Sequence, residues 1–242
     1  MSKKTALVTG GNKGIGKEVV RQLAGHRFQV YLGSRDAARR QVSVDELRAA
    51  GLYDVHLLVI DVTSEESVKS AVETLSSRIS ALDVLVDNAG VHQGYGDPIQ
   101  PQTALVLQAT YNANVYGVVR TTVGFLDLLK KSKAGRIVNV SSGLASFAVN
   151  TDPTSPYYAH NTVAYNSSKS AVNMITVSHS KSLAEFGIKV NACCPGYVAT
   201  DINKNTGFLT VDIGAIPIIK LATLPDDGPT GTYINKDGPL PW

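Results

Sequence analysis

Cysteines, strong net charge and long apolar runs are scarce or missing in this sequence, and each absence narrows what the protein can be. Its only cysteines are the neighbours Cys193 and Cys194. Adjacent cysteines cannot frame a disulfide scaffold, and they lack the spacing of zinc or redox motifs. We therefore expect no metal site, and two small buried residues at the end of a strand.

Charge and hydropathy exclude further classes of partner. The 23 basic and 20 acidic residues leave a formal net charge of +3, which gives no strong field for nucleic acid or a membrane surface. The apolar stretch near the N-terminus is far too short for a signal-peptide core or a membrane span. We expect a soluble cytoplasmic protein that acts on a small molecule, with no nucleic acid or membrane as partner.

The composition that is present fits a compact globular protein. Apolar residues make up 43% and charged residues 18%, and Gly (21) outnumbers Pro (10). A chain of 242 residues is ordinary for one doubly wound sheet and can bury a sizeable core without disulfides. With no internal repeat and no linker, the sequence predicts a single domain over residues 1–242.

Short β-branched runs alternate with longer segments that can form helices. The expected strands are Ala6–Thr9, Gln29–Leu32, His56–Asp61, Val84–Asn88, Arg136–Ser141 and Lys189–Cys194. The expected helices are Ile15–Ala24, Ser64–Ile79, Thr103–Lys131, Val163–Glu185 and Val211–Thr223. This alternation is typical of repeated βαβ units, and it predicts an α/β fold with a doubly wound, Rossmann-type parallel sheet and helices on both faces.

A glycine-rich turn follows the first expected strand directly. Gly10, Gly14 and Gly16 are spaced as GxxxGxG, and a helix-compatible segment follows them. A diphosphate must approach backbone N–H groups at a helix N-terminus, where larger side chains would block it. The spacing alone also fits a plain tight turn, but its place between strand and helix predicts a dinucleotide site.

The end of the second expected strand bears on cofactor choice. NAD-selective sites usually place a carboxylate there, whereas NADP sites supply positive charge for the 2′-phosphate. This strand ends in Ser34 and Arg35, and Asp36 lies about one residue beyond the position of a ribose-binding acid. Arg35, and Lys13 from the glycine turn, favour NADP(H), although either cation alone would more often be a solvated surface charge.

A tyrosine and a lysine share one face of an expected helix. Tyr165 and Lys169 are four residues apart, so an ammonium stands beside a phenol whose ordinary pKa is about 10. Such a cation favours the phenolate and lowers that pKa. The two hydroxyls of Ser141 and Ser142 end another expected strand at the sheet edge where open α/β folds bind ligands.

Together these motifs, in this order, resemble the short-chain dehydrogenase/reductase family over nearly the whole chain. The motifs are Thr9–Gly16, Asp61-Val62, Asp87–Gly90, Asn114–Gly117, Ser141-Ser142, Tyr165–Lys169 and Pro195–Thr200. Within the family, the segments 11–16 and 191–196 and the terminal Trp242 are similar to carbonyl reductases. The resemblance implies an NADPH-dependent enzyme that reduces a ketone or an aldehyde.

The resemblance also implies catalytic roles. Tyr165 would protonate the carbonyl oxygen as hydride leaves the nicotinamide, and Ser142, rather than Ser141, would hydrogen-bond that oxygen. Lys169 would bind the nicotinamide ribose and lower the Tyr165 pKa. Asn114 would hold a water that links Lys169 to solvent. Without the family resemblance, it would be interpreted as a core amide whose hydrogen bonds are satisfied.

Cofactor contacts are implied along most of the chain. Asp61 and Val62 would contact the adenine, Asn88–Gly90 would lie alongside its ribose, and Thr200 would bind the nicotinamide carboxamide. The full implied set is Gly10, Asn12, Lys13, Gly14, Ile15, Gly16, Ser34, Arg35, Asp61, Val62, Asn88, Ala89, Gly90, Tyr165, Lys169, Pro195, Gly196, Val198 and Thr200.

Two departures from the family pattern stand out. Asp87 takes a place where the family commonly has Asn. The segment Phe147–Ala164 makes the distance from Ser142 to Tyr165 longer than is common, and Phe147, Tyr157 and Tyr158 are expected to wall the substrate pocket.

Other interpretations remain open at this point. One is a non-catalytic NADP(H)-binding redox sensor or regulator, which would not need Asn114, Ser142, Tyr165 and Lys169 together. Another is an epimerase or dehydratase on the same fold, for which no extended substrate domain is evident. The particular carbonyl compound depends on Gln93–Pro98, Phe147–Tyr158 and Ile202–Thr210, and the choice between monomer and homo-oligomer stays undecided.

Overall fold

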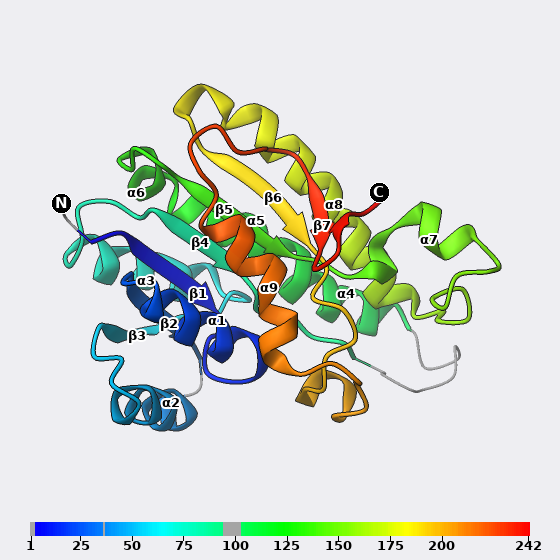
Figure 1. The fold of residues 1–242 in the computed structure, drawn as a ribbon, viewed down its shortest axis with the longest axis horizontal. Helices are drawn as coiled ribbons and strands as arrows, with labels where there is room; N and C mark the ends of the chain where they lie inside the picture. Colours follow the sequence, from blue (N-terminus) through cyan, green and yellow to red (C-terminus); the bar gives the residue numbers. More distant parts are fainter. Residues whose placement is uncertain (1–2, 36, 94–102) are drawn as a thin grey trace.

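The computed structural model describes residues 3–35, 37–93 and 103–242, and it is built on one twisted sheet (Figure 1). The strands lie in the order β3-β2-β1-β4-β5-β6-β7-β8, and all pair in parallel except the short β8. They are β1 (Thr5–Thr9), β2 (Gln29–Ser34), β3 (Val55–Val59), β4 (Val84–Asp87), β5 (Arg136–Val140), β6 (Lys189–Cys193), β7 (Tyr233–Asn235) and β8 (Gly238–Pro239).

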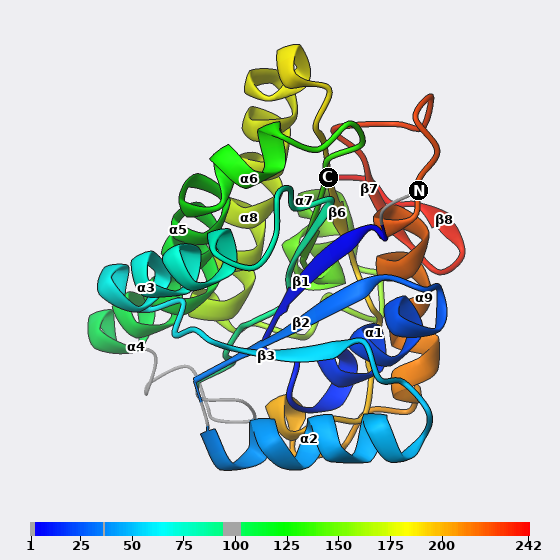
Figure 2. The same cartoon turned by 90° about the vertical axis from the view of Figure 1, so that its left-hand side faces the viewer.

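Helices cover both faces of this sheet, as Figure 2 shows edge-on. One face carries α1 (Gly14–Gly25), α2 (Ala37–Ala49) and α9 (Val211–Ala222). The other carries α3 (Glu65–Ser76), α4 (Ala104–Tyr111), α5 (Gly117–Gly124), α6 (Leu126–Lys130) and α8 (Val163–Ser182). The predicted doubly wound, Rossmann-type α/β fold is therefore confirmed.

The core lies in two layers because successive strand residues point to opposite faces. In β1, Ala6 and Val8 join the apolar cluster beneath α1 and α9, whereas Leu7 joins the cluster beneath α3 and α5. Every residue of β1 and β5 is buried. A sheet buried on both faces is a rigid platform, and its strand ends can place side chains at one edge.

The long helix expected over Thr103–Lys131 is divided, which corrects that prediction. A π-helical turn at Asn112–Tyr116 separates α4 from α5, and a break at Phe125 precedes α6. At Gly117 an added Cβ would lie 3.0 Å from Val62 Cγ2, so the chain here passes close to the loop after β3. Single π turns in α-helices often occur at functional sites, and this one carries Asn114.

The other expected helices and strands agree with the structure to within a few residues, and the pair Cys193 and Cys194 is buried at the end of β6 as predicted. Within the residues that the structure describes, we find no helix that is both long and apolar enough to cross a membrane.

Asp87, at the end of β4, is a buried acid in this platform. Its Oδ1 accepts a hydrogen bond from Thr121 Oγ1 at 2.7 Å, while Oδ2 has no partner among the described residues. Burial raises the pKa of Asp87 to about 7, despite the hydrogen bond from Thr121, which acts in the opposite direction. The carboxyl group is therefore more easily protonated in the folded chain than in the unfolded one.

This shift predicts that Asp87→Asn stabilises the protein in a pH-dependent way. Below about pH 4 the acid is protonated in both states and contributes no difference. As pH rises toward 7, only the unfolded chain loses the proton, so the free energy of unfolding falls, and the penalty is complete above 7. We expect Asp87→Asn to gain on the order of 2–4 kcal/mol at pH 8 and little at pH 4.

Urea denaturation of the parent and Asp87→Asn across this pH range measures the effect, with Asp127→Asn on the surface of α6 as the control. If the difference in unfolding free energy between the parent and Asp87→Asn is the same at pH 4 and pH 8, the pKa of Asp87 is not raised in the folded protein.

Candidate active site

A cavity of about 1330 Å³ opens at the carboxyl ends of the central strands and gathers the predicted site. All predicted site residues except Asn114 line it. They are Gly10, Asn12, Lys13, Gly14, Ile15, Gly16, Ser34, Arg35, Asp61, Val62, Asn88, Ala89, Gly90, Ser142, Tyr165, Lys169, Pro195, Gly196, Val198 and Thr200. Segments far apart in the sequence thus meet in one pocket because parallel strands end at one edge.

The glycine turn forms an open cradle at the start of α1. Gly10 (φ 64°) and Gly14 (φ 52°) have left-handed backbone conformations that favour glycine. A Cβ at Gly16 would lie 2.3 Å from the Gly10 carbonyl oxygen, so the turn closes only with glycine there. Lys13 precedes α1 without a side-chain cap, which leaves the first N–H groups of the helix available. These residues fit a diphosphate.

Asn88 fixes this turn to the neighbouring strand. Its Nδ2 donates to the Thr9 carbonyl at 2.9 Å, and Thr9 Oγ1 accepts from the N–H groups of Asn88 and Ala89 at 3.0 Å each. The ends of β1 and β4 are thereby locked together. The cradle is held by side-chain hydrogen bonds as well as by the sheet itself.

Two cations line the cavity from different segments, one of them at the end of β2. Ser34 is buried there, and Arg35 lies 3.8 Å from the carboxylate of Asp61. Lys13 Nζ lies 2.7 Å from a carboxylate oxygen of Asp201. Asp36 lies outside the described residues. Both predicted cations are therefore at the cavity, and each is paired with an exposed or partly exposed carboxylate.

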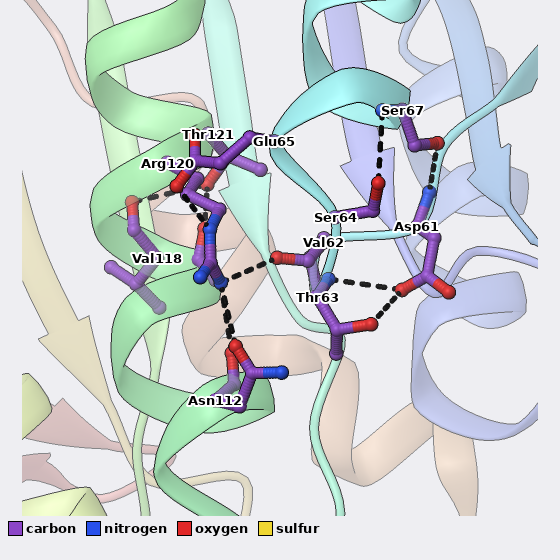
Figure 3. A network of polar contacts seen from close by, with 11 residues as sticks. Asp61, Val62, Thr63, Ser64, Glu65, Ser67, Asn112, Val118, Arg120 and Thr121 are labelled. Atoms are coloured by element: carbon purple, nitrogen blue, oxygen red, sulfur yellow. Dashed lines mark hydrogen bonds and ion pairs between the residues drawn. The ribbon is translucent and has the colours of Figure 1, made fainter. Parts of the chain in front are cut away.

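A polar network connects the loop after β3 to the π turn (Figure 3). Arg120 donates to the carbonyl oxygens of Val62 and Asn112, at 3.2 Å each, and to Glu65 Oε1 at 2.6 Å. Asp61 accepts from the N–H of Thr63 at 2.9 Å. Burial alone would raise the pKa of Asp61, but hydrogen bonds from Thr63 and the nearby Arg35 lower it below the ordinary value.

Sequence reasoning did not single out Arg120. Two of its partners, Val62 and Glu65, are distant in sequence, and one arginine on a helix gives no motif to recognise. In the structure it ties the loop predicted to meet the adenine to the turn that carries Asn114.

Ser142, Tyr165 and Lys169 meet at the centre of the cavity. Tyr165 and Lys169 share a face of α8, with Lys169 Nζ 5.8 Å from the Tyr165 ring centre. Lys169 Nζ donates to the Val140 carbonyl at 2.7 Å, and the side chain of Ser142 hydrogen-bonds the Tyr165 phenol. By contrast, Ser141 is buried and donates to Asn173 Oδ1 at 2.6 Å, so the geometry favours Ser142 for contact with a substrate.

The pKa values of this group are governed by burial. Desolvation raises the pKa of Tyr165 to about 12, and the hydrogen bond with Ser142 only partly opposes it. Desolvation also lowers the pKa of Lys169 to about 8. The expected lowering of the Tyr165 pKa by Lys169 is therefore absent from this arrangement, because the ammonium faces the Val140 carbonyl.

Asn114 lies beneath the cavity rather than on its surface. Its Oδ1 accepts from the Val91 N–H at 2.8 Å, and its Nδ2 donates to the Val91 carbonyl at 2.9 Å and to Ser168 Oγ at 3.0 Å. These bonds hold the chain after Gly90 beside α8. The role of Asn114 in binding a water remains a prediction.

His92 is a further cavity residue that the sequence motifs did not indicate. Its ring stacks on that of Tyr165, with centroids 4.1 Å apart and planes at 13°. Burial, and then the charge of Lys169, lowers the pKa of His92 to about 4, so the imidazole is neutral at physiological pH. The phenol ring of Tyr165 is thus flanked by an uncharged aromatic ring.

The segment Phe147–Ala164 contributes one of its three predicted wall residues. Tyr157 lines the cavity, and its ring lies so close to Gly143 that a Cβ there would be 3.0 Å from Tyr157 Cζ. Phe147 and Tyr158 are 71% and 49% exposed and lie outside the cavity lining. The prediction was wrong for these two, because the short helix α7 (Phe147–Thr151) and the following turn direct them to the surface.

Comparison with known proteins decides the family. The family described as short chain dehydrogenase matches residues 4–207. This chain belongs to the short-chain dehydrogenase family. It is therefore an oxidoreductase of a family that uses a nicotinamide cofactor, and the resemblance inferred from the motifs is confirmed.

Several short-chain dehydrogenases are similar along nearly the full chain. The (+)-neomenthol dehydrogenase of Arabidopsis thaliana is 33% identical, covering 96% of this chain and 95% of its own. Carbonyl reductase [NADPH] 1 of Pongo abelii is 31% identical, covering 98% of each. The crystal structure of NADPH-bound carbonyl reductase from chicken fatty liver superposes with a TM-score of 0.87 at 26% identity, covering 100% of each chain.

The placement of Tyr157 predicts that it influences substrate choice in this short-chain dehydrogenase. Tyr157→Ala removes a ring from the cavity wall beside Gly143 and should change the relative kcat/KM of small and bulky ketones by about tenfold. The dissociation constant of the cofactor should stay the same, because the ring lies away from the glycine cradle. Tyr158→Ala, on the surface of the same segment, is the matched control. If both variants keep the substrate ranking of the parent, Tyr157 has no part in selectivity.

Proposed function

We propose that this chain is a single-domain carbonyl reductase, which reduces a ketone or aldehyde to an alcohol with NADPH and uses Tyr165 as the proton donor. The observation that carries the proposal is the meeting of Ser142, Tyr165 and Lys169 in the same cavity as the glycine cradle. A nucleotide-binding protein without catalysis would not need this hydroxyl, phenol and ammonium beside one another.

The bound nicotinamide cofactor supplies the hydride. The cradle at Gly10, Gly14 and Gly16 would hold the diphosphate, so that the other end of the cofactor lies toward Tyr165. Ser142 would donate a hydrogen bond to the carbonyl oxygen and stabilise the negative charge that develops there.

Tyr165 would then transfer its proton to the same oxygen. A pKa raised by burial keeps the phenol protonated before the reaction. Lys169, with a pKa of about 8, can release a proton near neutral pH and would supply the proton that restores the phenol. His92 holds the ring of Tyr165 by stacking without adding a charge.

The choice of NADP(H) is supported by the residues at the end of β2. Ser34 leaves room for a 2′-phosphate, and Arg35 and Lys13 can donate charge-assisted hydrogen bonds to it. The similar proteins from Pongo abelii and chicken liver are described as NADPH enzymes or complexes, which agrees with this choice. For the substrate, Leu144 and Tyr157 near Ser142 favour an uncharged carbonyl compound.

Replacing the proton donor tests the mechanism. Tyr165→Phe should remove nearly all carbonyl reduction and largely spare NADPH affinity, because the ring stays and the transferable proton is lost. NADPH oxidation with a panel of ketones and aldehydes measures turnover, and nucleotide titration measures affinity. Near-normal turnover by Tyr165→Phe would refute the mechanism, and binding without turnover in the parent would favour a redox sensor or regulator.

The two adjacent hydroxyls provide a matched pair for the second prediction. Ser142→Ala should lower kcat on the order of 10²–10³-fold, the usual loss for one donor to a developing oxyanion. Ser141→Ala should have a much smaller effect, since its hydroxyl faces Asn173. The reverse order of effects would mean that Ser141 contacts the substrate.

Cofactor preference gives the third prediction of this proposal. Ser34→Asp should repel the 2′-phosphate and accept from a free ribose hydroxyl, which shifts preference toward NADH. Arg35→Ala should weaken NADPH more than NADH, and Lys13→Ala should do so to a similar or lesser degree. The kcat/KM for both cofactors in the parent and the three variants measures this. A parent that prefers NADH, or a ratio unchanged in all three, contradicts the assignment.

A further inference from the structure

The peptide group between Ser142 and Gly143 is held at both of its polar ends by side chains. Tyr233 Oη donates to the Ser142 carbonyl oxygen at 2.5 Å. The Gly143 N–H donates to Cys194 Sγ at 3.0 Å. The two partners come from β7 and from the residue after β6, so two neighbouring strands of the sheet fix a single peptide plane.

The backbone restrains this peptide through one hydrogen bond of the 3₁₀ turn, from the Ala145 N–H to the Ser142 carbonyl oxygen at 2.8 Å. Its second residue is glycine, which accepts positive and negative φ about equally and therefore allows the peptide plane to turn over. A larger residue here would crowd the cavity wall, because a Cβ at Gly143 would lie 3.0 Å from Tyr157 Cζ. Glycine fits beside Tyr157 without such a shift, and it leaves the peptide more dependent on other restraints.

The orientation of this peptide determines where the Ser142 hydroxyl points. Ser142 begins a short 3₁₀ turn, Gly143–Ala145, and its Oγ accepts from the Leu144 N–H at 3.2 Å. With that acceptor position occupied by the backbone, the hydroxyl can direct its proton into the cavity, where Ser142 hydrogen-bonds the Tyr165 phenol. If the peptide rotated, the Ser142 carbonyl would turn away from the Ala145 N–H, the 3₁₀ turn would open, and Ser142 Oγ would lose the Leu144 N–H that fixes its position.

Tyr233 is itself kept in place. Its side chain is buried, its backbone carbonyl accepts from the Leu240 N–H at 2.8 Å, and its ring stacks on Trp242 with centroids 5.4 Å apart. The Trp242 carbonyl in turn accepts from the Ala148 N–H at 3.3 Å. Burial raises the pKa of Tyr233, so its phenol remains a hydrogen-bond donor at any working pH.

We propose that Tyr233 is a positioning residue for carbonyl reduction: together with Cys194 it fixes the Ser142–Gly143 peptide, and so aims the Ser142 hydroxyl at the substrate oxygen. This inference rests on the proposed function of Ser142. Tyr233 lies far from the cofactor-binding motifs in the sequence, and none of those motifs indicates a role for its buried phenol.

Tyr233→Phe tests the proposal because it removes one hydroxyl and keeps the ring that packs on Trp242. We expect kcat to fall about tenfold, the typical effect of one neutral hydrogen bond, with KM and the NADPH dissociation constant nearly unchanged. Tyr158→Phe, which removes an exposed hydroxyl, is the control. In a Ser142→Ala background the same Tyr233→Phe change should have no further effect on kcat, because there is no hydroxyl left to aim.

Hydrogen exchange provides a readout that does not depend on activity. The amides of Gly143 and Leu144 should exchange faster in Tyr233→Phe than in the parent, while amides in the middle of β5 remain protected. Unchanged exchange at these two amides overturns the proposal, whatever the kinetics. An equal loss of kcat with and without Ser142 also overturns it, since the phenol would then act elsewhere or only on stability.

The same experiment separates this inference from the proposed function. If Ser142→Ala and Tyr165→Phe both retain full turnover, the assigned mechanism is wrong. If both are impaired but Tyr233→Phe behaves like the parent, only the role of Tyr233 is wrong.

Discussion

The ladder of backbone hydrogen bonds around β5 is the interaction on which the site depends. It pairs Asp87 with Asn139 on one side and Val140 with Cys193 on the other, so three strands end at matching heights. The residues that follow these strands then meet without any long loop to place them. Val140 also receives the ammonium of Lys169, which joins α8 to the same strand end. Small errors in this register would separate the hydroxyl, the phenol and the ammonium.

The elements that the sequence predicted well are those whose pattern is local. Buried β-branched runs located β1 and β5 to within a residue, because such strands need apolar side chains on both faces. The break in the helix after Thr103 was not visible, since the π turn lies where the helix packs against Val62, a residue of the distant loop after β3 to which Arg120 also donates. The strand β7 is only three residues long and gave no periodic signal.

In the candidate site, too, the features with a local sequence pattern were predicted and the others were not. The glycine cradle and the pair Tyr165 and Lys169 could be predicted, because phosphate binding and side chains four residues apart on a helix impose a spacing on the sequence. The direction in which the Tyr165 pKa is shifted could not be predicted, because it depends on how deeply the phenol is buried and on where the Lys169 ammonium points. His92 was missed for a related reason: stacking of two rings from separate segments leaves no local pattern.

The ion pair between Lys13 and Asp201 has a consequence for how a phosphate is met. Both side chains are more than half exposed, and an ion pair in such a setting contributes roughly 1 kcal/mol or less. The carboxylate therefore gives up the lysine at little cost. While it is present, however, it restricts the rotamers of a long, flexible side chain and holds its charge at the rim of the cavity. In the proposed NADP(H) complex, a phosphate at the rim would therefore compete with Asp201 for a lysine whose charge is already held there.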